Sequence, residues 1–258
     1  MVINLFNVLE QFEILPLLSL RLTKFSDISI TNTTFLLFLV IAVTYFFALT
    51  LYKSNTDKTF YLVPSRYQTF LELIYKMIAG MVLTNVGNDE GKKFFPLFFT
   101  VFLFLFILNL VGTVPYSFAV TSHIIVTFTF AFIIYFGFKI IGIIMHGFKL
   151  GSLLLPGGTS GVLCFILVPI ELISIVFKPV SLAVRLFANI MSGHILLKVI
   201  AGFVFTLTNF TGALFVLSFF PLFLLFPLIL LEMVVAMIQT YVFCILITIY
   251  LGEVITLH

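Results

Sequence analysis

The chain has 258 residues, of which 62% are hydrophobic and only 9% are charged. Soluble domains are about one quarter charged, so the composition predicts a helical membrane protein with several spans. The uncharged runs are too long for the strands of a membrane barrel. The formal net charge of +3 is small for this length and gives no reason to expect a nucleic-acid partner.

The N-terminal residues 1–32 have a mixed composition, and we predict that they form a surface segment. They contain Arg21 and Lys24 as their only basic residues and no Ala-x-Ala site, which is typical of neither a secretory signal nor an Arg-rich transit peptide. Phe occurs 35 times and Trp never. Because Phe codons are AT-rich, this bias hints at an organellar genome.

Residues 33–258 are predicted to form a single helical membrane domain. Three uncharged or nearly uncharged runs are long enough for one span each: 33–52, 94–114 and 124–145. Between the first two, residues 65–82 repeat apolar side chains at helical spacing and place Arg66, Glu72 and Lys76 on the other side. This pattern predicts an amphipathic helix on the membrane surface.

Two further apolar runs, 162–205 and 213–254, are each too long for one upright span. As single helices they would be about 60–65 Å long, whereas the hydrocarbon core is about 30 Å thick. No Gly/Asn/Asp turn cluster stands near Arg185 or Glu232, where upright spans would need a turn. We therefore predict two long, kinked helices that form a strongly tilted hairpin over 162–254. The fold class is then all-α, with about five membrane helices and one surface helix.

Orientation follows from the basic residues of the loops. Residues 53–93 contain six Lys or Arg residues, and the segment 114–123 contains none. The pattern predicts the N-terminus outside and the C-terminus inside. The two cysteines, Cys164 and Cys244, stand alone in apolar runs and are predicted to be core residues, neither metal ligands nor a disulfide.

The segment 168–194 carries a stripe of polar residues on an otherwise apolar helix. At about 100° per residue, the side chains that fall within about 40° of Arg185 are Glu171, Ser174, Lys178, Ser181, Asn189 and Ser192. A polar seam between two helices would need no arginine, which stays charged even when buried. A charge at membrane depth is costly and marks a functional site by default.

These residues carry a resemblance to a known family. KPVSLAVRLFANIMSGH, followed about 40 residues later by LEMVVAMIQTYVF, resembles subunit a of the F-type ATP synthase, also called ATPase subunit 6. FFPLFFTVFLFLFILNLVGTVPYSF and LEQFEILPLL resemble its mitochondrial form, nearer to the plant and protist versions. The resemblance covers nearly the whole chain.

The resemblance implies a proton-translocating stator subunit of the mitochondrial inner membrane. Two offset half-channels would lead to a rotating ring of c subunits, and Arg185 would separate them and contact the ring's carboxylate. Gln239 matches the usual partner of that arginine, and Asn189 and Ser181 match polar positions near it. The partners implied are the c-ring, b-type and small membrane subunits of the stator, protons and the lipid bilayer. The resemblance leaves open whether the complex dimerises.

The residues themselves predict where the hairpin brings polar groups together. Arg185 and Gln239 lie equally far from a turn near residue 212, and His194 and Glu232 nearly so. Glu171 and Glu253 would meet at the inner end. We expect His194 and Glu232 to relay protons on the outer side, because imidazole titrates near neutrality. A static contact that only holds the hairpin is the alternative.

Other polar residues are assigned on the same pattern. We expect Glu171 and Glu253 to serve the inner half-channel, and a link from Glu171 to Lys178 is the alternative. His123 and Asn109 border the outer side and could extend the entrance, or only cap and hydrogen-bond the loop. The His194–Glu232 pair has too few ligands for a metal, and no cofactor is expected.

Two other classes of function stay open at this stage. A self-contained channel or secondary transporter would usually show an internal repeat, and none is found. A structural membrane anchor predicts that replacing Arg185 alters assembly, whereas a proton channel predicts loss of proton flux in an assembled complex. No phosphate-binding Gly-rich loop with Lys-Ser/Thr is present. The chain is thus expected to be non-catalytic by itself, with ATP chemistry on other chains.

Overall fold

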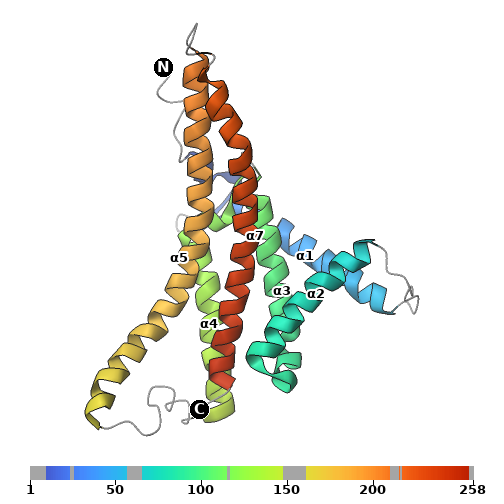
Figure 1. Cartoon of the computed structure of the whole chain (residues 1–258), viewed down its shortest axis with the longest axis vertical. Coiled ribbons are helices and arrows are strands. Elements are labelled where there is room, and N and C mark those ends of the chain that lie inside the picture. The colour runs from blue at the N-terminus through green and yellow to red at the C-terminus, as the bar shows by residue number, and fades with distance from the viewer. Residues whose placement is uncertain are drawn as a thin grey trace. The chain divides into compact units, whose positions relative to one another are not determined.

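The computed structural model describes residues 10–23, 26–56, 66–114, 117–147, 161–209, 215 and 217–255. Within them the chain is almost entirely helical (Figure 1). Five helices are long and apolar enough to cross a membrane. The prediction of an all-α membrane protein is therefore confirmed. The division into a surface segment and one helical domain stays a prediction.

The chain divides into two compact units, each assembled from three stretches of sequence. The first unit contains Met1–Val43, Phe104–Ile124 and Leu186–Thr240. The second contains Thr44–Leu103, Ile125–Arg185 and Tyr241–His258.

The N-terminal segment begins with a short 3-10 turn, η2 (Glu10–Phe12), and continues as an antiparallel hairpin of β1 (Pro16–Thr23) and β2 (Ser26–Thr31). The hairpin pairs Leu18 with Ile30 and Leu20 with Ile28. Helix α1 (Asn32–Thr56) follows directly. Its start is capped by Thr31, whose Oγ1 accepts the backbone N–H of Thr34. The two strands were not expected from the sequence.

Helix α2 (Arg66–Val86) coincides with the predicted amphipathic helix. It buries Ile78, Met81, Val82 and Val86 and leaves Leu73 exposed. Its membrane-surface position stays a prediction, because it is also long and apolar enough to span. A single residue, Gly87, separates it from α3 (Asn88–Gly112). The φ of Gly87 is +98°, a conformation that glycine adopts without strain.

Helix α4 (Ile124–His146) begins one residue after a short buried turn, η3 (Val120–Ser122). In the second unit α4 runs beside the C-terminal part of α7 (Figure 1). Aromatic pairs join the two helices: Phe130 contacts Phe243, and Tyr135 packs edge-to-face on Tyr250. Gly147 ends α4 with φ of +57°. The loop predicted after it lies outside the described residues from 148 to 160.

The two long apolar runs form one helix each, α5 (Gly161–Thr208, 48 residues) and α7 (Phe219–Ile255, 37 residues). Neither breaks near Arg185 or Glu232, so the prediction of two long helices is confirmed. Pro169 and Pro179 lie inside α5, and Pro227 lies inside α7. Asn209 is in a turn, next to the turn predicted near residue 212, and 210–214 lie outside the described residues. In the first unit the two helices lie side by side (Figure 1).

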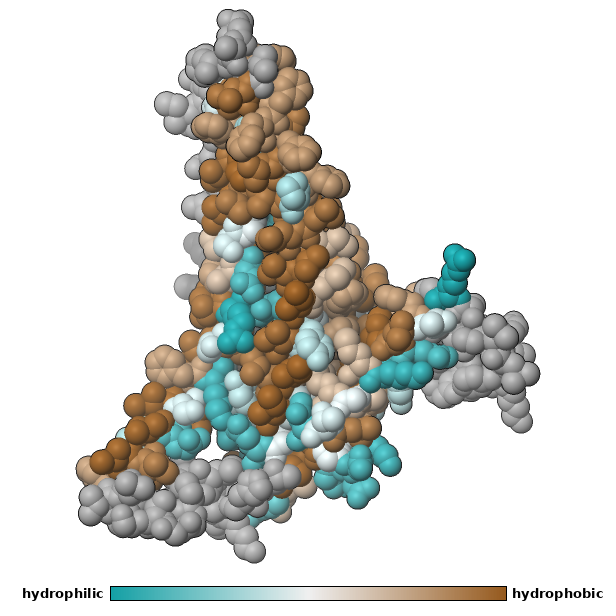
Figure 2. All heavy atoms as spheres, viewed as in Figure 1, coloured by the Kyte–Doolittle hydropathy of each residue, from teal (hydrophilic) through white to brown (hydrophobic). Residues whose placement is uncertain are grey.

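Apolar side chains dominate the surface (Figure 2). Helix α5 exposes Phe177 and Phe203, and α7 exposes Phe223 and Phe226, each by more than half. In water such a surface would be strongly unfavourable, but lipid solvates it. Hydrophilic side chains gather along α5 and α7 within the apolar face (Figure 2), and these carry the candidate site.

Candidate functional site

Arg185 lies at the midpoint of α5, and its side chain is exposed. Ser181 and Ser192, one and two turns away on the same stripe, are exposed as well. The apolar neighbour Val184 is also exposed. A permanent cation therefore projects from the middle of a helix whose surroundings are hydrocarbon-like, and it requires a protein or water partner there.

Asn189 and Gln239 form a direct hydrogen bond between α5 and α7. The Nδ2 of Asn189 donates to Oε1 of Gln239 at 2.8 Å. Gln239 is only 4% exposed, and its Nε2 has no protein partner among the described residues. The hairpin thus joins Gln239 to the residue one turn beyond Arg185. The role expected of Gln239 beside Arg185 stays a prediction.

Asn109 on α3 extends this polar layer. Its Nδ2 donates to Oγ1 of Thr240 at 3.0 Å, and Thr240 in turn donates to the carbonyl of Ala236. Asn109 is buried, whereas its Oδ1 has no described partner. Thr240 was missed from the sequence, although its position directly after Gln239 places it on the adjacent face of α7.

His194 is buried, 4% exposed, and contacts three elements. Its Nε2 lies 2.5 Å from the carbonyl oxygen of Gly112, at the end of α3. A carbonyl oxygen only accepts, so Nε2 carries the proton and Nδ1 is the free acceptor of the neutral ring. The same Nε2 lies 3.7 Å from Oε1 of Glu232. The ring of Phe12 packs edge-on, with 6.1 Å between the ring centroids.

Glu232 is 5% exposed, and neither carboxyl oxygen has a hydrogen-bond partner among the described residues. It packs on Gly193: a Cβ added to that glycine would lie 2.8 Å from Oε1. A larger residue at 193 would force the flexible end of the Glu232 side chain to move. Ionised carboxylates are costly to bury unpaired, so the site suits a group that exchanges protons. The expected proximity of His194 and Glu232 is confirmed; their role as a relay stays a prediction.

Glu253 in the second unit has a different partner from the one expected. Nζ of Lys178 lies 2.6 Å from Oε2 of Glu253 and 5.2 Å from the ring centre of Tyr250. The pair is accessible, with 22% of the lysine and 42% of the glutamate side chain exposed. Thus Lys178 bonds to Glu253, and the alternative link to Glu171 is not the one formed.

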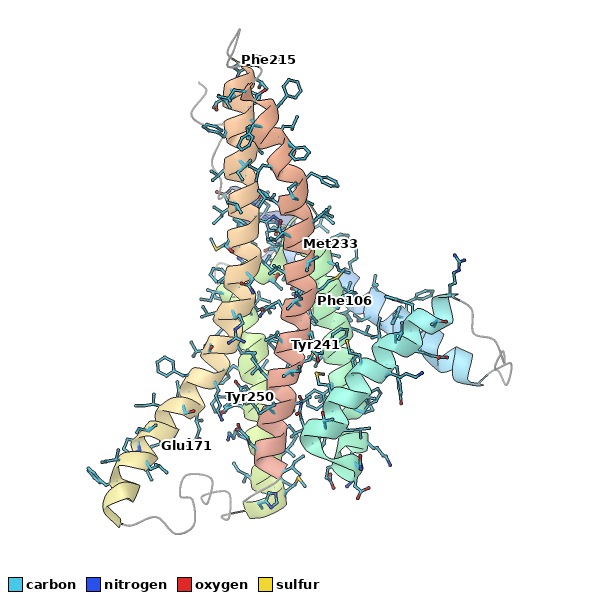
Figure 3. All side chains as sticks on the ribbon, viewed as in Figure 1. Phe106, Glu171, Phe215, Met233, Tyr241 and Tyr250 are labelled. Atoms are coloured by element: carbon cyan, nitrogen blue, oxygen red, sulfur yellow. The ribbon has the colours of Figure 1, made fainter. Side chains whose placement is uncertain are left out.

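Glu171 is half-buried and lies on the N-terminal part of α5 (Figure 3), and both Glu171 and Glu253 interact electrostatically with Lys139 of α4. Glu171 was expected to lie next to Glu253, which required α5 and α7 to remain paired along their whole length. The N-terminal part of α5 diverges from α7 in the second unit (Figure 3). The expected contribution of both acids to an inner half-channel stays a prediction.

His123 lies in the turn between α3 and α4. Its ring stacks on Phe118 at 5.2 Å, and its Nε2 is buried without a described partner. Burial lowers the pKa of His123 below the ordinary value of 6.5. The imidazole is therefore neutral near pH 7, and its role at an outer entrance stays a prediction.

Among the described residues no group of three His, Cys, Asp or Glu side chains could hold a metal ion. Cys244 is buried, as predicted, and unpaired; the side chain of Cys164 lies outside the described set.

The fold and site together define a multi-pass helical membrane protein with buried ionisable side chains and an exposed arginine at the midpoint of a long apolar helix. Comparison with known proteins makes the assignment specific. The family model for the ATP synthase A chain matches residues 33–252. The chain is 48% identical to ATP synthase subunit a of Pylaiella littoralis over 97% of this chain and 98% of that protein. It is 41% identical to ATP synthase subunit a of Chondrus crispus, over 97% and 96%.

The chain belongs to the ATP synthase subunit a family. The resemblance inferred from the sequence is thereby confirmed, as is the general function: a membrane subunit of the proton-translocating Fo sector.

Proposed function

We propose that this subunit forms two offset half-channels beside a ring of c subunits, and that Arg185 separates them. The supporting observation is the exposure of Arg185 at the midpoint of α5, flanked by exposed Ser181 and Ser192. Contact with lipid alone would be energetically unfavourable for this cation. A passing carboxyl group on a partner protein would satisfy it.

The chemistry follows from the permanence of the arginine charge. A ring carboxyl group that approaches Arg185 is favoured in its ionised form, so it releases its proton. The guanidinium does not take up that proton, because its own pKa exceeds about 12. Protons therefore cannot pass directly between the half-channels, and net flux requires rotation of the ring. The hydrogen bond between Asn189 and Gln239 would hold two side-chain amide groups about one helical turn from Arg185.

On the outer side His194 and Glu232 act as the relay. The Nε2–H of His194 points at the Gly112 carbonyl, so an incoming proton binds at Nδ1. The ring is then doubly protonated and can release the Nε2 proton toward Glu232, whose Oε1 is 3.7 Å away. The transfer leaves the remaining proton on Nδ1, so the ring must flip or lose that proton to water and regain one at Nε2 before it can pass a second proton. His123 and Asn109 extend the outer entrance.

On the inner side Glu171 and Glu253 serve the second half-channel. The exposure of the Lys178–Glu253 pair supports contact with water on that side. Lys178 holds the Glu253 carboxylate in place, whereas Glu171 lies farther along α5.

The complex lies in the mitochondrial inner membrane, and the chain assembles there with the c-ring, a b-type stator subunit and small membrane subunits. The relatives at 48% and 41% identity are named as ATP synthase subunits a, which supports such an assembly. The apolar surface of α5 and α7 supports burial in lipid and against other membrane chains.

The deciding experiment replaces Arg185. We expect Arg185→Lys to assemble but to lose coupled ATP synthesis, because a lysine in a dry site can lose its proton. Arg185→Ala should also assemble and should lose proton-driven synthesis. Normal synthesis by the lysine variant contradicts the proposal. Loss of assembly in the alanine variant supports a structural anchor instead, and proton transport by the purified chain without a c-ring supports a self-contained transporter.

A further inference from the structure

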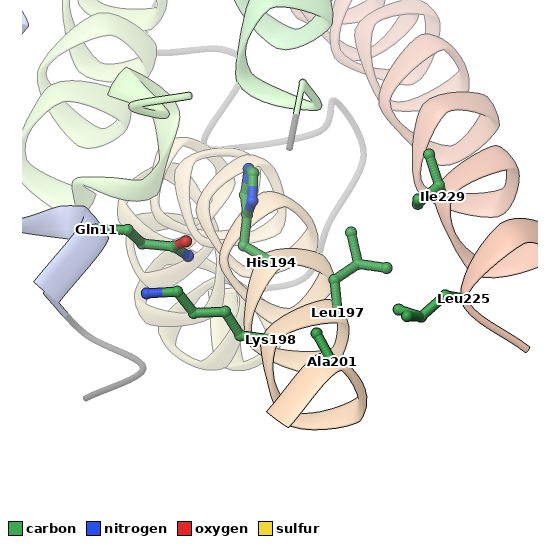
Figure 4. Close-up of a pocket in the computed structure, with 7 residues that line it drawn as sticks. All are labelled: Gln11, His194, Leu197, Lys198, Ala201, Leu225 and Ile229. Carbon is green, nitrogen blue, oxygen red and sulfur yellow. The ribbon is translucent and has the colours of Figure 1, made fainter. Parts of the chain in front are cut away.

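The acids on the two sides of the proposed path have different surroundings. On the outer side a cavity of about 150 Å³ adjoins His194, and Gln11 and aliphatic side chains complete its wall (Figure 4). On the inner side Glu171 and Glu253 stand on helices that diverge (Figure 3). Both of these acids interact electrostatically with Tyr135 of α4, so a third helix connects them.

The ring of Tyr135 is fixed by its neighbours on α4 and α7. It meets the ring of Tyr250 edge-to-face, with 5.6 Å between the ring centroids and 88° between the planes. Lys139, one helical turn farther along α4, places its Nζ 5.6 Å from the centre of the Tyr135 ring. Nζ of Lys178 lies 5.2 Å from the centre of the Tyr250 ring. Each ring of the pair thus has a cation near it, and the position of Tyr135 is well defined.

The hydroxyl group of Tyr135 takes no part in these ring contacts. The residue is only 2% exposed, and its hydroxyl oxygen is buried without a hydrogen-bond partner among the described residues. Burying an unpartnered hydroxyl is unfavourable. Phenylalanine, which the chain uses at 35 positions, would make the same ring contacts without this cost. A tyrosine at this position therefore indicates a function for the hydroxyl group rather than for the ring.

Carboxyl groups are the candidate partners of this hydroxyl. Glu253 already accepts a hydrogen bond from Lys178 at 2.6 Å, whereas Glu171 has no such ion pair within the described part of the chain. Glu171 is half-buried, and its side chain has several rotatable bonds. It is therefore the acid that the Tyr135 hydroxyl can orient.

We propose that Tyr135 is a positioning residue of the inner half-channel, and that its hydroxyl orients the Glu171 carboxyl group through a hydrogen bond. The bond forms directly when Glu171 turns inward, or through one bridging water. Tyr135 keeps its own proton, and Glu171 remains the group that exchanges protons. The inference rests on the proposed inner half-channel and adds to it the residue that places its acid.

The first test removes only the hydroxyl group. Tyr135→Phe keeps the ring that contacts Tyr250 and Lys139, and Tyr241→Phe is the matched control, because Tyr241 is a 38% exposed tyrosine of the same unit. We expect Tyr135→Phe to lower passive proton conduction through Fo, per assembled complex, about three- to tenfold, the range of one hydrogen bond. Tyr241→Phe should conduct as the parent does. Parent-like conduction by Tyr135→Phe, or an equal loss in the two variants, overturns the assignment.

The second test asks whether the hydroxyl acts through Glu171. Glu171→Asp keeps an acid, so proton conduction remains measurable, but it withdraws the carboxyl group by one methylene. Adding Tyr135→Phe to Glu171→Asp should then cost less than about twofold, because groups that act through one another are not additive. In Glu253→Gln the same addition should cost as much as it does in the parent. A purely structural role of Tyr135 predicts the full loss in both backgrounds, and that result overturns the inference.

A third comparison separates this inference from the function on which it rests. If Arg185→Lys conducts protons and synthesises ATP normally, the proposed function itself fails. If Arg185→Lys and Glu171→Gln lose activity while Tyr135→Phe matches Tyr241→Phe, the inner half-channel stands and the assignment of Tyr135 alone is wrong.

Discussion

Two glutamates on the same helix, Glu232 and Glu253, have opposite surroundings. Glu232 is buried against the backbone of Gly193, with an imidazole nearby and no hydrogen bond to either oxygen among the described residues. Glu253 is exposed and bonded to Lys178 at 2.6 Å. Ionisation costs little free energy for an exposed carboxylate beside a cation. It costs much more for a carboxylate that is buried without a cation. The comparison predicts that Glu232 exchanges protons, and that Glu253 serves the inner half-channel mainly as a fixed negative charge held by Lys178.

The largest expected effect comes from removing the charge of the buried acid. Glu232→Gln keeps the shape but cannot accept a proton, so we expect proton-driven ATP synthesis to fall at least about tenfold, within the usual range for lost proton transfer. Glu253→Gln is the matched control. The measurement is ATP synthesis per assembled complex. Equal losses in the two variants would contradict the different roles predicted for Glu232 and Glu253.

The next effect concerns the space that Gly193 leaves for Glu232. In Gly193→Ala the new methyl group would meet the carboxyl group at 2.8 Å, so the flexible end of the side chain must move away from His194. We expect a several-fold loss of proton conduction with normal assembly. Combining it with Glu232→Asp, which shortens the side chain by one methylene, should recover part of the loss. A double variant worse than both single variants would show that the clash is not with this carboxyl group.

A smaller effect is expected at the exposed pair. Lys178→Met removes the cation bonded to Glu253, and since accessible ion pairs contribute about 0–1 kcal/mol, the loss of synthesis should stay within about threefold. The reversed pair, Lys178→Glu with Glu253→Lys, tests whether the bond itself matters. Recovery in the reversed pair indicates a structural bond. If instead Lys178→Met is as impaired as Glu232→Gln, the inner pair takes part in proton transfer.

The smallest expected effect is a pH dependence at His123. Burial lowers its pKa in the folded protein, so the neutral form is favoured by folding. The stability that this provides is present above the unfolded pKa near 6.5 and declines as the pH falls below it. After correction for the intrinsic pH dependence of amide exchange, the protection of residues 117–123 should therefore fall as the pH is lowered from 7.5 to 5.5. His123→Gln, which cannot be protonated, should show no such fall in protection.

The sequence by itself determined the class of the protein, its two long helices and the identity of its polar residues. Uncharged runs longer than a bilayer, without turn residues at Arg185 or Glu232, leave little alternative to long helices. His194 and Glu232 lie at similar distances along the chain on either side of the predicted hairpin turn, and this spacing also placed them together. These features depend on local pattern and on distance along the chain, which a sequence displays directly.

Only the tertiary structure decided which polar groups bond to one another. Gln239 binds Asn189, one turn from Arg185, and Glu253 binds Lys178 rather than meeting Glu171. The difference of a turn or two depends on how the side chains of two helices interlock and where the helices diverge, which equal spacing cannot predict. The contacts of His194 with Gly112 and Phe12 come from segments more than 80 residues away. No periodicity within α5 could reveal them, because a backbone carbonyl and an N-terminal turn are brought there by the fold alone.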